Sequence, residues 1–216
     1  NENGNAKKAE FPDLLHPNAV GYKMWEKTLR PVLELMDLVE VPVDNFKCEE
    51  GYELLFNGKD LSGWGYRNKK TLTKIENFDG MATSSEGRYH AKHGRLVVTT
   101  PPEGRSFTQL WTVEELDRDF TLKLEFRANA NADSGVFIRR PQLQCRDYLV
   151  AGPYKDLKNY KPGDWNEIIV VVKGRIARCT CNGEVLEEDF KLPKGGPIGL
   201  EGDRGQMEYR RIRLKR

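Results

Sequence analysis

Alternation of apolar and polar residues marks most of the chain after residue 50. Over residues 120–127 every second side chain is apolar and those between are polar, which predicts a strand with one face in a core. Residues 168–172 form a nearly continuous apolar run that predicts another strand. Turn residues separate such segments, for example at Asn57-Gly58, Pro162-Gly163 and Asn182-Gly183. The pattern predicts an all-β fold, an antiparallel sandwich or jelly roll.

The N-terminal part of the chain follows a helical period instead. Apolar residues recur at helical spacing over residues 17–36, at Val20, Met24, Trp25 and Leu29. Pro31 is expected to interrupt this helix and to begin a second short one over residues 31–37. We therefore predict two parts, an N-terminal extension with one or two helices over residues 1–50 and a β-sandwich domain over residues 51–216.

The apolar face of the N-terminal helix has two interpretations. Met24 and Trp25 pack against the outside of the sandwich domain, or they dock a partner or cap a site. A structural or interaction protein that binds a partner through this helix is therefore one functional hypothesis.

Composition and charge exclude several classes of protein. With 38% hydrophobic and 31% charged residues, the chain is neither disordered nor membrane-embedded, and no apolar run approaches the roughly 20 residues of a membrane span. A formal net charge of +2 gives no general attraction to nucleic acid. The basic C-terminal residues 210–216 alternate with Ile212 and Leu214, which predicts a solvated edge or terminal strand rather than a nucleic-acid patch.

The N-terminus and the cysteines indicate in which cellular compartment we expect the protein. The chain begins at Asn1 rather than methionine, as expected if a signal peptide or lipoprotein leader was removed or the sequence was trimmed, so we expect a periplasmic, cell-surface or secreted protein. An oxidising compartment would allow a bridge among Cys48, Cys145, Cys179 and Cys181. Cys179 and Cys181 share one face of a strand and lack the second Cys/His pair of a zinc site, which favours packing in the core.

Six short motifs follow one another in a fixed order from residue 51 onward. They are Gly51 to Trp64, Asp133-Ser134-Gly135 leading to Arg139, Gln142-x-Gln144-x-x-Asp147, residues 161–166, Asn182-Gly183, and residues 199–202 with residues 208–212. In this order they resemble the 3-keto-disaccharide hydrolase family, formerly a domain of unknown function. The resemblance implies a two-sheet, concanavalin A-like jelly roll that cleaves an oxidised (3-keto) glucoside or disaccharide, a carbohydrate partner.

The resemblance also implies a set of catalytic candidates. A 3-keto group acidifies the hydrogen at C2, so one base can expel the C1 substituent by β-elimination before water adds. Glu125, Asp147 and Glu201 are candidate bases or ligands of a divalent cation, whose identity stays open. Arg139 is a candidate stabiliser of the enolate oxygen, although Glu125 and Arg139 could also form an idle ion pair across neighbouring strands.

Amides and aromatic rings supply candidate sugar contacts. Gln142 and Gln144 could fix sugar hydroxyls, and Trp111, Tyr148 and Trp64 are candidate platforms for a sugar ring, each with the alternative of a core or rim position.

Two features count against ordinary two-carboxylate glycoside hydrolysis. The Glu-x-Asp-x-x-Glu strand of laminarinase-like glucanases has its nearest match in residues 201–206, which end in Gln206 and contain two glycines, so we expect a turn there. Gln142 stands where the family pattern usually has Glu, and an amide cannot act as a base. A non-catalytic carbohydrate-binding module of the same fold is therefore the alternative function.

Overall fold

The computed structural model describes residues 7–13, 15–99, 109–147 and 153–216. They belong to two compact units, Asn1–Pro42 and Val43–Arg216. The second unit begins before residue 51, since Asp44 and Glu49 form ion pairs with Arg211 and Arg213 of the last strand.

One helix, α1 (Ala19–Leu35), forms most of the first unit. The Asn18 side chain caps it by accepting hydrogen bonds from the backbone N–H groups of Val20 and Gly21. Our prediction of a break at Pro31 is wrong, because the helix continues through this residue; a proline removes one backbone donor and bends a helix more often than it ends it. Within the described ranges, no helix has the length and apolar character that a bilayer crossing needs. Partner docking by α1 stays a prediction.

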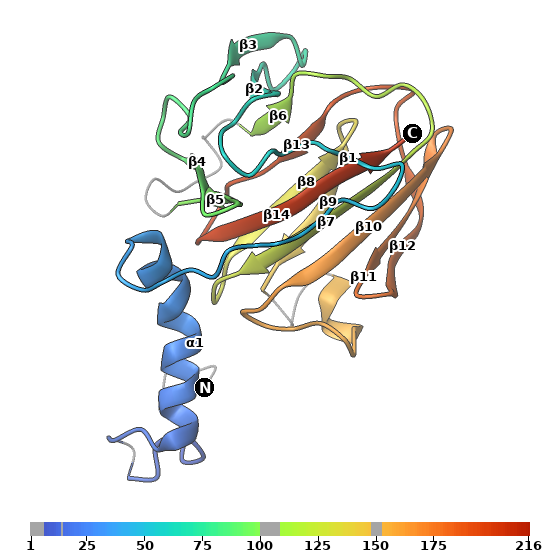
Figure 1. Ribbon diagram of the computed structural model, residues 1–216. Helices are drawn as coiled ribbons and strands as arrows, with labels where there is room; N and C mark the ends of the chain where they lie inside the picture. Colours follow the sequence, from blue (N-terminus) through green and yellow to red (C-terminus); the bar gives the residue numbers. More distant parts are fainter. Residues whose placement is uncertain (1–6, 14, 100–108, 148–152) are drawn as a thin grey trace. The chain divides into compact units, whose positions relative to one another are not determined.

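Two antiparallel sheets form the second unit (Figure 1). The eight-stranded sheet has the order β12-β11-β10-β7-β14-β5-β4, with β1 also paired to β14. Its strands are β1 (Glu53–Leu54), β4 (Tyr89–Lys92), β5 (Arg95–Val98), β7 (Phe120–Ala128), β10 (Asn166–Lys173), β11 (Ile176–Cys181), β12 (Glu184–Lys191) and β14 (Met207–Lys215).

The six-stranded sheet has the order β3-β2-β6-β13-β8-β9. Its strands are β2 (Trp64–Arg67), β3 (Lys74–Asn77), β6 (Leu110–Thr112), β8 (Asp133–Ile138), β9 (Gln142–Arg146) and β13 (Ile198–Leu200), and a short 3₁₀-helix, η1 (Pro153–Asp156), follows β9. The predicted all-β jelly-roll sandwich is confirmed.

The core lies between the two sheets. Leu122, Leu124 and Phe126 of β7 are fully buried in the same apolar cluster as Val136 and Ile138 of β8. The intervening residues of β7 are only partly buried, which confirms the alternation in the sequence. Each sheet therefore has an inner face in the core and an outer face that carries polar side chains.

The C-terminal strand lies inside the sheet, so its prediction as an edge strand is wrong. β14 pairs with β7 on one side and with β5 and β1 on the other. Ile212 and Leu214 are buried, as the alternation requires. The pairing of β14 with β7 is irregular between Arg210 and Arg213, where Arg211 has a φ of +51°. Asp44 and Glu49, from the segment before β1, form ion pairs with Arg211 and Arg213.

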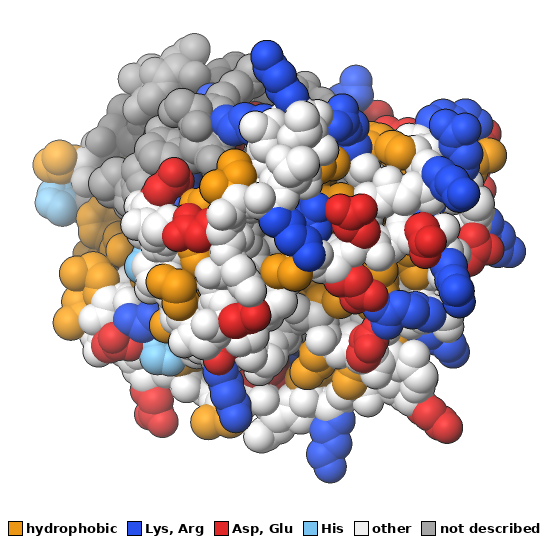
Figure 2. All heavy atoms as spheres, turned by 90° about the horizontal axis from the view of Figure 1, so that it is seen from above, with side chains coloured by type: hydrophobic (Ala, Val, Ile, Leu, Met, Phe, Trp, Pro, Cys, Tyr) orange, Lys and Arg blue, Asp and Glu red, His pale blue; other side chains and the backbone are white. Residues whose placement is uncertain are grey.

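The described cysteines are free thiols. Cys145, Cys179 and Cys181 are fully buried, and burial raises the pKa of Cys179 and Cys181 to about 12. The prediction that they pack in the core is confirmed. On the face that Figure 2 displays, acidic and basic side chains are interspersed, in agreement with the small net charge.

Candidate functional site

Side chains from four neighbouring strands meet on the outer face of the six-stranded sheet. Across this face, Trp111 of β6 lies opposite Gly199 of β13, Gly199 opposite Phe137 of β8, and Phe137 opposite Gln142 of β9. Trp111 is buried, with 3% of its surface exposed, yet it lies outside the core cluster. Its ring contacts Phe137 with a centroid distance of 5.1 Å. The two rings form an aromatic surface on this face.

Glu201 extends the same face from the end of β13. Its backbone N–H donates to Gly135 (2.9 Å), and Gly135 is paired with Gln144 of β9. We call Trp111, Phe137, Gln142, Gln144 and Glu201 the sheet-face site.

Two glycines allow the larger side chains to lie flat against the sheet. A Cβ atom at Gly199 would fall 2.5 Å from the Trp111 ring, and one at Gly135 would overlap the amide of Gln142. Because each glycine lies beside the residue whose side chain covers it, any other amino acid would push Trp111 or Gln142 away from the face.

The Asp-Ser-Gly motif has a separate structural task at each position. Asp133 forms an ion pair with Arg146 of β9 at 2.9 Å. The Ser134 hydroxyl points inward, where it contacts the Tyr209 hydroxyl (2.9 Å) and donates to the Glu201 carbonyl. Gly135 leaves room for Gln142. The motif thus connects three strands and positions the backbone of Glu201.

The Glu201 carboxyl is half-buried and has a raised pKa. Burial is the main cause, and the negative charges of Asp203 and Asp133 add to it. Hydrogen bonds from Gln109 and Gln142 act in the opposite direction, because they stabilise the carboxylate. A carboxylate with a raised pKa is a stronger base than an exposed one.

Two buried polar atoms of the site lack a hydrogen-bond partner among the described residues. They are the indole Nε1 of Trp111, a donor, and the amide Oε1 of Gln144, an acceptor. Buried polar atoms nearly always have a partner, so these two are suited to a ligand with both donor and acceptor groups.

A sequence profile described as the 3-keto-alpha-glucoside-1,2-lyase-like domain matches residues 51–215. The chain belongs to this family. The match includes every strand of the lyase-like domain and all residues of the sheet-face site.

Several solved structures resemble the lyase-like domain, and the first of those below supports its fold. A protein described as a candidate glycosyl hydrolase from Parabacteroides distasonis superposes with a TM-score of 0.59 at 19% identity, covering 79% of this chain and 98% of its own. A second such protein from the same organism has a TM-score of 0.46 at 20% identity and covers 59% and 89%. A carbohydrate-binding module from Bacillus subtilis has a TM-score of 0.42 at 10% identity and covers 72% and 97%. A search of curated proteins found no match.

The structure brings together four of the predicted site residues, Trp111, Gln142, Gln144 and Glu201. Asp147 follows β9, where its carboxylate accepts a hydrogen bond from the Asn131 backbone N–H (3.1 Å). Tyr148 lies outside the described residues.

Of the two interpretations of Trp64, sugar platform or core residue, the structure shows the core position. This ring is fully buried in the core cluster, and its indole N–H donates to the Leu55 carbonyl at 2.7 Å. Trp64 is therefore a core residue and not a sugar platform.

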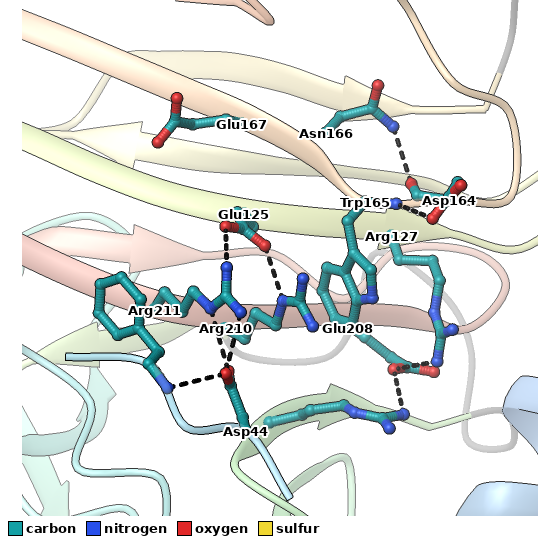
Figure 3. A network of polar contacts seen from close by, with 12 residues as sticks. Asp44, Glu125, Arg127, Asp164, Trp165, Asn166, Glu167, Glu208, Arg210 and Arg211 are labelled. Carbon is teal, nitrogen blue, oxygen red and sulfur yellow. Dashed lines mark hydrogen bonds and ion pairs between the residues drawn. The ribbon is translucent and has the colours of Figure 1, made fainter. Parts of the chain in front are cut away.

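Glu125 lies on the opposite side of the lyase-like domain, on the outer face of the eight-stranded sheet. Figure 3 shows its carboxylate directed at Arg210 and Arg211, at 2.7 and 2.8 Å, with Trp165 beside Arg210. The alternative of an ion pair between Glu125 and Arg139 is wrong, because β7 and β8 belong to different sheets.

Arg139 is buried at the end of β8, away from the sheet-face site. Its guanidinium donates to the backbone carbonyls of Arg118 (2.6 Å), Gly174 (2.8 Å) and Pro193 (3.3 Å) and lies over the Phe120 ring. These contacts join three loops, so the geometry favours a structural role for Arg139.

Sequence reasoning missed Phe137 and Gln109. Phe137 could have been found, because it lies between the inward-facing Val136 and Ile138 and must therefore point outward. Gln109 precedes β6 and has no comparable signal in the sequence. Among the described residues, no three His, Cys, Asp or Glu side chains gather as metal ligands, so no ligand set is assigned to the predicted divalent cation.

Replacement of Arg139 should destabilise the fold. Arg139→Ala leaves three loop carbonyls without their donor, and we expect a loss of about 3 kcal/mol in the free energy of unfolding by urea denaturation. The adjacent Arg140 is exposed and donates to the Lys70 carbonyl, so Arg140→Ala serves as the control and should lose about 0.5 kcal/mol or less. Equal stability of the two variants would contradict the structural role.

Glu201 should make stability depend on pH. Because its pKa is higher in the folded than in the unfolded protein, its contribution is fully present below the ordinary value of 4.5 and is lost as the pH rises through the raised pKa. Glu201→Gln should therefore gain stability relative to the parent protein between pH 4 and pH 7, measured by urea denaturation at both values. A difference that does not change with pH would show that the carboxylate is not under electrostatic strain.

Proposed function

We propose that the lyase-like domain cleaves a 3-keto glucoside or disaccharide by β-elimination and hydration on the sheet-face site, with Glu201 as the base. The observation that carries this proposal is the half-buried Glu201 carboxyl with a raised pKa, on the same face as a buried donor and a buried acceptor that have no hydrogen-bond partner among the described residues. Membership of the 3-keto-alpha-glucoside-1,2-lyase-like family supports the class of substrate.

The proposed reaction has two stages. In the first, Glu201 takes the proton from C2, the C2–H electron pair forms the enolate with the C3 ketone, and the C1–O bond then breaks as a C1=C2 double bond forms. The leaving oxygen takes up a proton. In the second, water adds across this double bond, with its hydroxyl on C1 and a proton on C2, which regenerates a 3-keto sugar. One base is enough for the first stage, in contrast to the two carboxyl groups of ordinary glycosidases.

Binding is assigned to the other residues of the site. The Trp111 N–H donates to a sugar oxygen, and the Gln144 Oε1 accepts from a sugar hydroxyl. The rings of Trp111 and Phe137 contact the apolar side of the sugar.

A non-catalytic carbohydrate-binding module is the second candidate function. Gln142 favours it, because this amide replaces a carboxylate in the family pattern and leaves Glu201 to act without a second acid. The two functions differ in turnover, whereas sugar binding is common to both.

Glu201→Gln should abolish most turnover and keep the fold. We expect kcat to fall by about 10² or more, the scale of a lost general base, when the protein is incubated with a 3-keto glucoside with and without a divalent cation. In the parent protein kcat/KM should increase with pH through the raised pKa of Glu201, because only the carboxylate accepts a proton. Glu125→Gln on the other sheet is the matched control and should keep its turnover.

Two outcomes would contradict the assignment. Loss of turnover in Glu125→Gln but not in Glu201→Gln would place the base on the eight-stranded sheet. Absence of product from the parent protein under every metal condition, with sugar binding intact in both variants, would select the binding module.

Removal of the Trp111 N–H should weaken sugar binding. Trp111→Phe keeps an aromatic ring but loses the N–H, and we expect about a tenfold higher Kd by calorimetry with the matching unoxidised glucoside. Trp165→Phe, on the eight-stranded sheet, is the control with the same change. Equal affinities of the two variants would remove the Trp111 N–H from the binding site.

A further inference from the structure

The contact between Gln142 and Glu201 is a distinctive feature of the sheet-face site. The Gln142 side chain lies over Gly135, where a Cβ atom would overlap it, and its Nε2 donates to Oε2 of Glu201. The amide is thus directed along the sheet by the missing side chain of Gly135. Glu201 directly follows β13, Gln142 belongs to β9, and β8 lies between these two strands.

We propose that Gln142 is a positioning residue for Glu201: its Nε2 holds Oε2 of the carboxylate, in addition to the hydrogen bond from Gln109, and so fixes the direction in which the base faces the substrate. This inference rests on the proposed function for its catalytic meaning, while the contact itself is independent of any activity. A neutral amide suits this task because it donates a hydrogen bond without adding a charge that would compete for the proton.

The charges around Glu201 make a neutral donor important. The ionisable groups coupled to it electrostatically are Asp133, Asp203, Tyr89 and Tyr209, and Arg146 and Arg88 contact Asp133 and the Asp203 backbone. Arg146 is paired with Asp133, Arg88 donates to the carbonyls of Thr99 and Asp203, and the two tyrosines are buried with strongly raised pKa values. Asp133 and Asp203 both oppose ionisation of Glu201.

A carboxyl group at position 142 would act in the opposite way. Two carboxyl groups in contact share one proton, and the second ionisation of the pair is strongly disfavoured. The base would then stay protonated to higher pH. A side chain of the same length without a donor would leave Glu201 with the Gln109 hydrogen bond alone, so the carboxyl would be held less firmly and its pKa would also rise, though by less.

Two variants at position 142 test the proposal. Gln142→Met removes the donor and keeps the length, and Gln142→Glu replaces the donor with a second carboxyl. Glu201 is observed by carbon-13 NMR of labelled glutamate in the sugar-free protein, with Glu201→Gln to assign its signal. We expect the titration midpoint to rise in Gln142→Met and to rise by about one pH unit or more in Gln142→Glu. The acid limb of kcat/KM should move with it.

The chain contains a matched control on its other face. Gln206 donates its Nε2 to Glu208 at 3.0 Å, so Gln206→Met breaks the same kind of contact away from the site. It should leave both the Glu201 midpoint and the pH profile unchanged. Above the midpoint, where Glu201 is ionised in both proteins, Gln142→Met should still lower kcat by about tenfold or more with little change in KM, because the base is no longer held in place.

The outcomes separate this inference from the proposed function. A Glu201 midpoint that is the same in the parent protein, Gln142→Met and Gln142→Glu would overturn the role of Gln142, even with normal turnover. If the Glu201 midpoint shifts in these variants but the parent protein turns over no 3-keto glucoside, the role of Gln142 holds and the proposed function is rejected. If Gln142→Glu fails to fold, as shown by circular dichroism, the Met variant decides, because it adds no charge.

Discussion

Both sheets must bury one face in a single core, and this constraint fixes which side chains of each strand point outward. Once Leu122 and Leu124 of β7 point inward, Glu125 must point outward, and the same holds for Phe137 between Val136 and Ile138. Outward residues of different sheets lie on opposite sides of the core and cannot meet. Alternation along a strand therefore decides which polar residues can share a site, before any specific contact forms.

This constraint explains how much could be predicted from the sequence. The strands, the sandwich and the outward position of Glu125 follow from local periodicity, because the period of two depends only on neighbouring residues. The sheet to which a strand belongs depends on pairing between distant segments. For that reason the interior position of β14 and the separation of Glu125 from Arg139 were not predictable from periodicity. Arg139 stands at the position in the motif where a functional arginine was expected. Its partners are backbone carbonyls, and the pattern of side chains in a sequence does not predict where backbone carbonyls lie.

The candidate site was predicted in part by the order of motifs. That order pointed to Gln142, Gln144 and Glu201 in segments far apart in sequence, and the sheet brings them onto one face. The reason for the glycines was not visible in the sequence. Gly135 and Gly199 lie in strands, where glycine is unfavourable, and only the close approach of neighbouring side chains accounts for them.

The site also opposes the stability of the fold that carries it. A carboxylate with a raised pKa costs free energy in the absence of ligand, and so do an indole N–H and an amide oxygen that have no partner in the described part of the chain. A sequence selected for stability alone would replace these groups with apolar residues. Their presence together on one face is therefore better explained by a ligand that satisfies them than by folding. The Gln142 amide limits this cost, because it stabilises the ionised form of Glu201 and leaves the carboxylate basic enough to accept a proton.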